Sequence, residues 1–230
     1  MTLSLVKRPR ENVQAGLFCL ADARSKFYYT LLSIAVVLGA RMIENAMHEY
    51  AHAAVVLLSG GEVVGLPVVT PFGGFTRWND VPASWLAAVN VAGTAASAAA
   101  MLAIFLPLYI KAKQPLARWI GYWGACVLPV NMISYWVLTP FLASAQRYDP
   151  VAFATNAAIV PPWIVGIIAA VPFAISVWWM VKATRDLQAR DLADPRHFHA
   201  ICLVIYYIIS LGIPVVSYAG LLNERYFWGW

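Results

Sequence analysis

Five long stretches of mainly apolar residues constrain the fold of this chain more than any other feature. A helix needs about 20 such residues to cross a membrane, because each residue adds only about 1.5 Å along the axis. Stretches of this kind lie at 27–59, 84–110, 116–142, 161–181 and 200–222. Of the 230 residues, 61% are hydrophobic and 12% are charged, against about 25% charged in soluble domains. The sequence therefore predicts an all-α integral membrane protein, a bundle of about five transmembrane helices.

Residues 60–83, after the first stretch, have a different character. Glycines and prolines interrupt the helical pattern here, and the valine pairs between them favour extended structure. We expect a short extended or hairpin-like segment that lies against the bundle, because non-helical backbone at membrane depth must be covered by protein or water. The predicted organisation is a cytoplasmic N-terminal segment (1–26), a polytopic membrane domain (27–222) and an aromatic C-terminal tail (223–230).

Basic residues are distributed unevenly over the connecting segments and predict the orientation. With a cytoplasmic N-terminus, the inside segments hold Lys7, Arg8, Arg10, Arg24, Lys26, Lys111, Lys113, Arg118, Lys182, Arg185, Arg190 and Arg196, and the outside segments hold Arg77, Arg147 and Arg225. Cytoplasmic loops of membrane proteins carry such an excess of Lys and Arg. We therefore expect a multi-pass protein with its N-terminus in the cytoplasm. The net charge of +5 then reflects topology and contact with the lipid bilayer, not binding to nucleic acid.

The motif H-E-x-x-H occurs inside the first apolar stretch, as His48-Glu49-Tyr50-Ala51-His52. Two histidines four positions apart fall on one face of a helix and can hold a Zn²⁺ together. Glu49 beside them can act as general base on a metal-bound water. Ionisable groups are costly inside a membrane, so their presence indicates function. The sequence predicts a metallohydrolase working within the membrane, with His48 and His52 as metal ligands and Glu49 as catalytic base.

A catalytic zinc usually has three protein ligands and an open position. Asp149 is the leading candidate for the third ligand, because the five-span topology places it on the same side as the end of the motif helix. Its alternative role is to cap a helix starting at Pro150. His197 and His199 are interpreted as part of a solvated charged loop, together with Asp186, Asp191, Asp194 and Arg196. The cysteines lack the spacing of a disulfide framework or metal site and are expected to be free thiols: Cys19, Cys126 and Cys202.

Other polar residues share the face of the motif helix. Arg41, Glu44 and Asn45 fall in the same arc as the histidines, at about 100° per residue. Glu44 lies one turn before His48 and could orient its imidazole, or it could pair with Arg41. Glu44 and Asn45 are therefore candidates for supporting the ligands or binding substrate, and a purely structural polar stripe is the alternative.

The surroundings of the motif resemble the site-2 protease family of intramembrane zinc metalloproteases. Pro71-Phe72-Gly73-Gly74-Phe75 is similar to the P-x-G-G-aromatic element of that family, and Ala92-Gly93 heads a helix rich in small residues, as in its A-G-P-x-x-N segment. The resemblance covers about residues 40–150. It implies a zinc-dependent endopeptidase that cleaves a transmembrane substrate near the cytoplasmic side, with Gly73 and Gly74 as substrate-binding candidates.

The chain also departs from the family pattern. Thr94 and Ser97 replace the proline and asparagine of that segment, and Asp149-Pro150 stands where the family has Asp-Gly. Asn131 is the candidate for the asparagine that precedes this pair, at a longer spacing. The predicted topology places the C-terminal end of the motif helix outside, whereas the resemblance implies a site near the cytoplasm. Either the first span consists of two half-helices, or the site opens toward the outside.

The expected function is an intramembrane zinc endopeptidase that cleaves a transmembrane or membrane-proximal peptide bond. Two alternatives stay open. H-E-x-x-H determines the activation of water but not the bond that is cut, so the substrate could be a lipid or a small molecule. The protein could also be non-catalytic with a structural metal site, which would show four protein ligands or lack the base.

Overall fold

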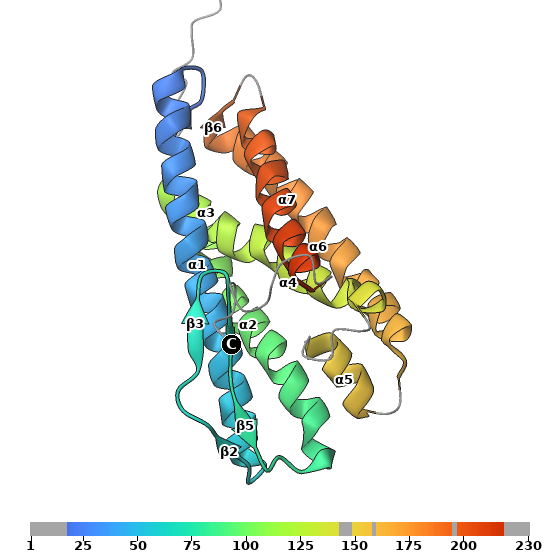
Figure 1. The fold of residues 1–230 in the computed structure, drawn as a ribbon. Coiled ribbons are helices and arrows are strands. Elements are labelled where there is room, and N and C mark those ends of the chain that lie inside the picture. The colour runs from blue at the N-terminus through green and yellow to red at the C-terminus, as the bar shows by residue number, and fades with distance from the viewer. Residues whose placement is uncertain (1–17, 143–148, 158–159, 195–196, 219–230) are drawn as a thin grey trace, which may run out of the picture.

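The computed structural model describes residues 18–142, 149–157, 160–194 and 197–218, and these are mostly helical. The helices are α1 (Ala23–Leu58), α2 (Ala83–Lys111), α3 (Pro115–Tyr122), the π-helix η1 (Trp123–Val127), α4 (Leu128–Val137), the 3₁₀ helix η2 (Thr139–Leu142), α5 (Asp149–Ala157), α6 (Pro162–Arg190) and α7 (Phe198–Tyr218). Figure 1 shows α1 along one side of the molecule, with α6 and α7 on the opposite side. The predicted tail at 223–230 lies outside the described residues.

Three of these helices, α1, α2 and α6, are long and apolar enough to cross a membrane. Helix α7 contributes a shorter apolar stretch, Phe198–Leu211. The expected third span at 116–142 is broken into α3, η1, α4 and η2. Pro129 is the second residue after the π-helix, and it lacks the N–H that an α-helix would bond to the carbonyl of residue 125. Composition could not predict this break, because apolar residues continue on both sides of it.

Helix α1 is a single helix of 36 residues. Its N-cap is Asp22, whose carboxylate accepts hydrogen bonds from the backbone N–H and the hydroxyl of Ser25, at 2.9 and 2.8 Å. These two bonds hold the pKa of the Asp22 carboxyl below its usual value. At the other end Gly60 takes a φ of +85°, which permits the tight turn that ends the helix. The helix starts four residues before the predicted span. The alternative that the first span consists of two half-helices is wrong, because α1 is continuous.

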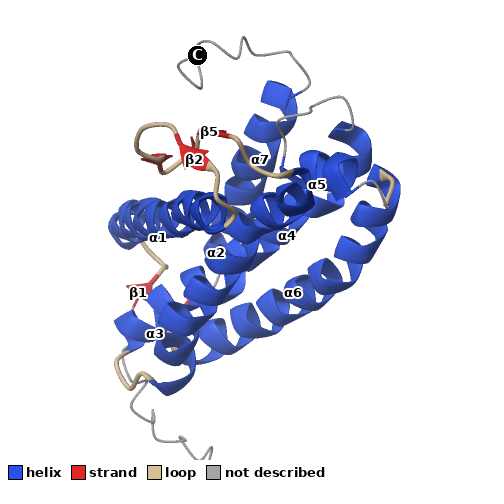
Figure 2. Ribbon diagram, turned by 90° about the horizontal axis from the view of Figure 1, so that it is seen from below, coloured by secondary structure: helices blue, strands red, loops and turns tan. Residues whose placement is uncertain are grey.

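The segment after α1 is extended, as predicted. Strands β3 (Val68–Thr70) and β4 (Gly73–Phe75) form an antiparallel hairpin, and β2 (Glu62–Val63) pairs antiparallel with β5 (Trp78–Asn79). These strands lie against the lower half of α1 (Figure 1). Seen from below, they are on one side of α1 and α2, and α6 is on the other (Figure 2). We refer to residues 62–79 as the strand segment.

The opposite end of α1 packs into an aromatic cluster. His199 of α7 is fully buried there, with its Nδ1 hydrogen bonded to the Tyr29 hydroxyl and its Nε2 3.1 Å from the Tyr122 hydroxyl. Asp191 is buried as well and forms an ion pair with Arg118. The interpretation of this region as a solvated loop was therefore wrong for His199 and Asp191. Their polar atoms find partners on distant helices, which the local sequence does not reveal. The short strands β1 (Phe18–Cys19) and β6 (Leu192–Ala193) pair in parallel nearby.

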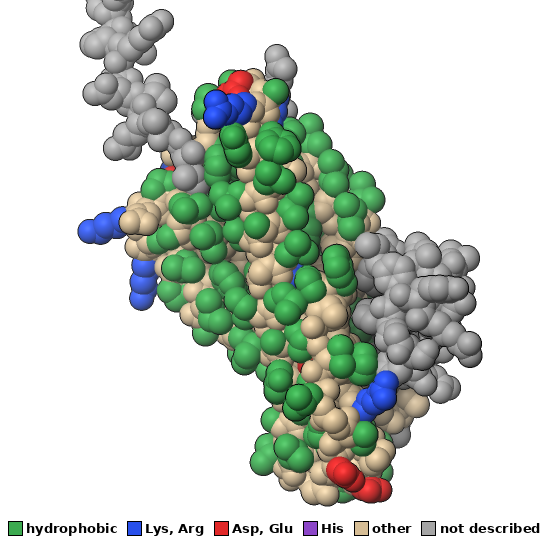
Figure 3. All heavy atoms as spheres, turned by 60° about the vertical axis from the view of Figure 1, so that its left-hand side comes forward, with side chains coloured by type: hydrophobic (Ala, Val, Ile, Leu, Met, Phe, Trp, Pro, Cys, Tyr) green, Lys and Arg blue, Asp and Glu red, His purple; other side chains and the backbone are tan. Residues whose placement is uncertain are grey.

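The outer surface of the helices is apolar. Figure 3 shows hydrophobic side chains over the middle of one face, with most of the charged side chains toward its ends. Large apolar side chains stand exposed on the helices, among them Ile34, Leu57, Val171, Ile175 and Trp178. Such a surface suits lipid better than water. The three cysteines are free, as predicted.

Candidate metal centre

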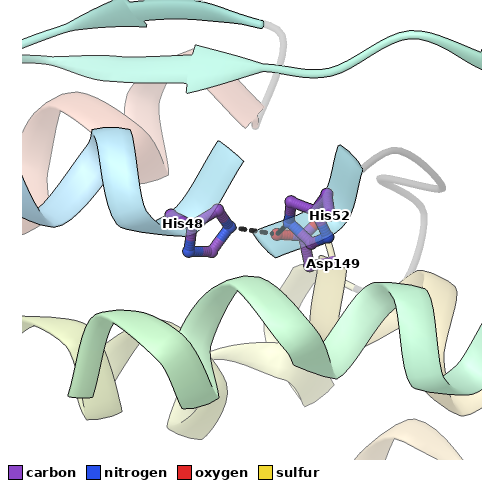
Figure 4. Close-up of side chains that lie close together, drawn as sticks. All are labelled: His48, His52 and Asp149. Carbon is purple, nitrogen blue, oxygen red and sulfur yellow. Dashed lines mark hydrogen bonds and ion pairs between the residues drawn. The ribbon is translucent and has the colours of Figure 1, made fainter. Parts of the chain in front are cut away.

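Two histidines of α1 and the first residue of α5 converge on one point. The ligand atoms of His48, His52 and Asp149 all lie within 4.8 Å of one another. Asp149 Oδ2 is 2.9 Å from His48 Nε2 and 3.4 Å from His52 Nε2 (Figure 4). A tetrahedral zinc with bonds of about 2.0–2.1 Å keeps its ligand atoms about 3.3 Å apart. The spacing of the three groups therefore suits one small cation. Asp149 begins α5, so the helix-starting role and the contact with the histidines coexist.

A backbone carbonyl determines which nitrogen of His52 faces the cluster. His52 Nδ1 lies 2.6 Å from the carbonyl oxygen of Val89 on α2, and a carbonyl can only accept a hydrogen bond. Nδ1 therefore carries the proton, and Nε2 of the neutral ring presents its lone pair toward Asp149. This is the tautomer that a metal ligand requires.

Gly93 of α2 leaves the room in which an ion would sit. A Cβ at this position would lie 2.5 Å from His52 Nε2 and 2.6 Å from His48 Nε2. Figure 4 shows α2 running directly beside the three side chains. Only glycine lets the backbone of α2 pass so close to both imidazoles. The donor set and this cradle together fit a bound zinc.

Exposure differs across the cluster. The side chain of His52 is 3% exposed, whereas those of His48 and Asp149 are 19% and 18% exposed. The cluster is therefore more open to its surroundings on the side of His48 and Asp149.

The strand segment holds Glu49 from the other side. The Thr76 hydroxyl oxygen lies 2.9 Å from Glu49 Oε2 and 2.9 Å from the Glu49 carbonyl oxygen, so it shares its proton between them. Gly74 covers the same side chain, because a Cβ there would lie 2.6 Å from Glu49 Cγ. Glu49 and Thr76 are both buried. The carboxylate is thus fixed next to the histidines in one position.

The remaining polar residues of α1 anchor the strand segment. Glu44 forms an ion pair with Arg41 at 3.0 Å, which is the second of the two roles open for it from the sequence. Arg41 Nε also donates to the Pro71 carbonyl at 3.4 Å, and Asn45 Nδ2 donates to the Thr70 carbonyl at 2.7 Å. Asn45 therefore holds the strand segment in place. The hairpin is closed by Thr70 Oγ1, which donates to the carbonyl of Gly73.

Thr94 and Ser97 of α2 each form a hydrogen bond to another helix. Ser97 donates to the Glu44 carbonyl at 2.9 Å, and Thr94 accepts a hydrogen bond from Trp136 Nε1 at 2.9 Å. Both contacts tie α2 to a neighbouring helix. Asn131 is buried on α4, and its Oδ1 has no hydrogen-bond partner among the described residues.

Sequence reasoning did not identify three groups at this site: the Thr76 hydroxyl, the Val89 carbonyl and the Trp78 ring. The Trp78 and His52 ring centroids are 6.1 Å apart, with 32° between the planes. A backbone carbonyl carries no signal in the sequence. The only available signal for Thr76 and Trp78 was their closeness to Gly74.

Comparison with known proteins does not identify this chain: no family model, no curated protein and no solved structure matches it.

Replacing Gly93 with Ala is expected to lower zinc affinity at least about tenfold, because the new methyl group must displace the imidazoles. The matched control is Gly39→Ala on α1, where a Cβ would meet no atom of the described residues within 4 Å. Zinc content after dialysis against a chelator measures both. Equal zinc retention by the two variants would show that Gly93 does not shape a metal site.

Proposed function

We propose that this chain is an intramembrane zinc endopeptidase and a divergent member of the site-2 protease family. The observation that carries the proposal is that two imidazole nitrogens of α1 converge with the Asp149 carboxylate of α5 next to Glu49, while α1 is long and apolar enough to cross a membrane. The proposed topology keeps five spans, with α3 to α4 as the broken third and α7 as the fifth, and a cytoplasmic N-terminus. The basic residues of the sequence support this orientation.

His48, His52 and Asp149 would hold the zinc, which supplies a Lewis acid for water and for the substrate carbonyl when bound. Glu49 accepts the proton of the attacking water and passes it to the nitrogen of the leaving amine. Glu49 Oε2 is engaged by Thr76, which leaves Oε1 to take this proton. Because the carboxylate is buried and oriented, little reorganisation is needed when the proton moves.

The strand segment is the proposed binding site for substrate. A transmembrane helix must unwind locally before cleavage, since its carbonyls are hydrogen bonded and sterically covered. Within the described part of the chain the hairpin of β3 and β4 is two-stranded, so an extended peptide can add to its edge by backbone hydrogen bonds. Asn45 and Arg41 hold this hairpin to α1, and Gly74 brings it within contact of Glu49.

The class of substrate is tested by supplying the detergent-solubilised, zinc-loaded protein with transmembrane peptides and, separately, with phospholipids. We expect new peptide termini, detected by mass spectrometry, and intact lipids. Hydrolysed lipid with uncut peptides would instead support a metal-dependent lipid hydrolase. Stoichiometric zinc with neither product would support the non-catalytic alternative.

Thr76→Val is expected to lower kcat about tenfold or more, with KM and zinc content unchanged, because the variant keeps the shape but removes a hydrogen bond to a charged group. Thr76→Ser keeps the hydroxyl and is expected to restore most of the rate. Steady-state kinetics on one cleaved peptide measures the effect. A Thr76→Val protein with wild-type kcat would show that the hydroxyl does not position Glu49.

A further inference from the structure

A pocket of about 180 Å³ lies between the C-terminal parts of α2 and α6. Its lining includes Tyr109 and Ile110 of α2, with Trp179, Lys182, Asp186 and Arg190 of α6. Tyr109 follows Gly93 by about 24 Å along α2, at about 1.5 Å per residue. The pocket is therefore separate from the candidate metal centre.

The pocket carries a positive charge. Lys182 and Arg190 contribute two cations against the single carboxylate of Asp186. Lys182 Nζ lies 5.7 Å from the centroid of the Trp178 ring, and Arg190 Nε donates to the Asp186 carbonyl oxygen at 3.3 Å. Neither contact neutralises the charge, and neither cation belongs to an ion pair found among the described residues. Lys111, at the last position of α2, follows Ile110 directly and adds positive charge. An anion entering the pocket therefore meets cations that are still available for it.

The walls combine this charge with apolar and aromatic surface. The rings of Tyr109 and Trp179 pack edge to face with centroids 6.1 Å apart. Ile110 is 60% exposed, and Ile175 and Trp178 of α6 are also exposed, so apolar surface adjoins the pocket. Aromatic rings next to lysines and arginines are typical of the level at which lipid headgroups lie.

We infer that this pocket binds the headgroup of an anionic glycerophospholipid. Lys182 and Arg190 contact the phosphate, and the acyl chains follow the exposed apolar side chains of α2 and α6. Basic pockets between transmembrane helices recognise headgroups in this way. A soluble phosphate would find the same cations but would leave the apolar surface unused. The inference rests on the proposed membrane embedding of α2 and α6 and is independent of the protease chemistry.

The test uses purified full-length protein in a neutral detergent, titrated with phosphatidylglycerol or phosphatidylcholine of the same acyl chains, with bound lipids counted by native mass spectrometry. We expect phosphatidylglycerol to bind about tenfold more tightly than phosphatidylcholine. The double variant Lys182→Ala/Arg190→Ala should lose this preference. The control Lys113→Ala/Arg185→Ala removes the same amount of charge from exposed positions that do not line the pocket. This control should keep the preference for phosphatidylglycerol.

Three results would overturn the inference. The two lipids could bind equally well, or both double variants could lose the preference to the same extent, which would indicate only a general attraction to basic surface. Inorganic phosphate could displace the lipid at equal concentration, which would identify a soluble anion as the occupant. Circular dichroism of each variant confirms that altered binding does not come from unfolding.

Discussion

Replacing Glu49 with Gln is expected to slow peptide cleavage by about 10²–10⁴-fold while zinc content stays unchanged, because general base catalysis typically contributes that much. The amide keeps the size of the side chain, and its oxygen can still accept the hydrogen bond from the Thr76 hydroxyl. The strand segment should therefore remain seated against α1. What the variant lacks is an oxygen that can take the proton of the attacking water.

The measurement is the initial rate of cleavage of one transmembrane peptide, together with zinc content by elemental analysis. Glu62→Gln is a matched control, since Glu62 is an exposed acid on β2, close in sequence to the same helix. A Glu49→Gln protein with full cleavage would eliminate the proposed mechanism. A Glu49→Gln protein that also loses its zinc would place Glu49 among the groups that hold the ion.

Replacing Asp149 with Ala is expected to lower zinc affinity by at least about 100-fold, because two imidazoles alone leave the ion poorly coordinated by protein. Asp149→Asn tests the loss of the negative charge separately from any disruption of α5. Asn is also a good residue for starting a helix, so α5 should persist while the negative charge next to the histidines is lost. Without zinc, we expect the Asp149→Asn protein to melt at the same temperature as the wild type. Its zinc binding should be weaker.

Competition with a chelator of known affinity measures these changes. Asp186→Asn, on the exposed surface of α6, is the control and should bind zinc like wild type. Full zinc binding by Asp149→Ala, combined with loss of zinc in Glu44→Gln, would mean that the ligands lie mainly on α1. In the structure Glu44 is paired with Arg41, and we therefore expect Glu44→Gln to keep its zinc.

The parts of this fold that the sequence predicted are those with a local cause. The spacing of His48 and His52 places both on one helix face, and that helix forms without interruption. Glycines and prolines after it predicted the strand segment. Asp149 became a candidate through topology, although it lies far from the histidines in sequence, and the structure brings it beside them.

The parts that the sequence did not predict depend on distant contacts. The break of the expected third span at η1 is invisible in composition, since apolar residues continue through it. The burial of His199 depends on Tyr29 and Tyr122, which lie on other helices, so its charged neighbours in the sequence were misleading. Likewise, Thr76 contacts Glu49 only after the strand segment folds back onto α1.

The most direct test of the central claim is zinc K-edge X-ray absorption on the purified full-length protein. The proposed function predicts about one zinc per chain, with two imidazole nitrogens at about 2.0–2.1 Å, one carboxylate oxygen and one exchangeable water. Asp149→Asn should lose or alter the carboxylate contribution, and Glu49→Gln should leave the spectrum unchanged. Absence of stoichiometric zinc, or a site with four protein ligands and no exchangeable water, would contradict a catalytic metal centre.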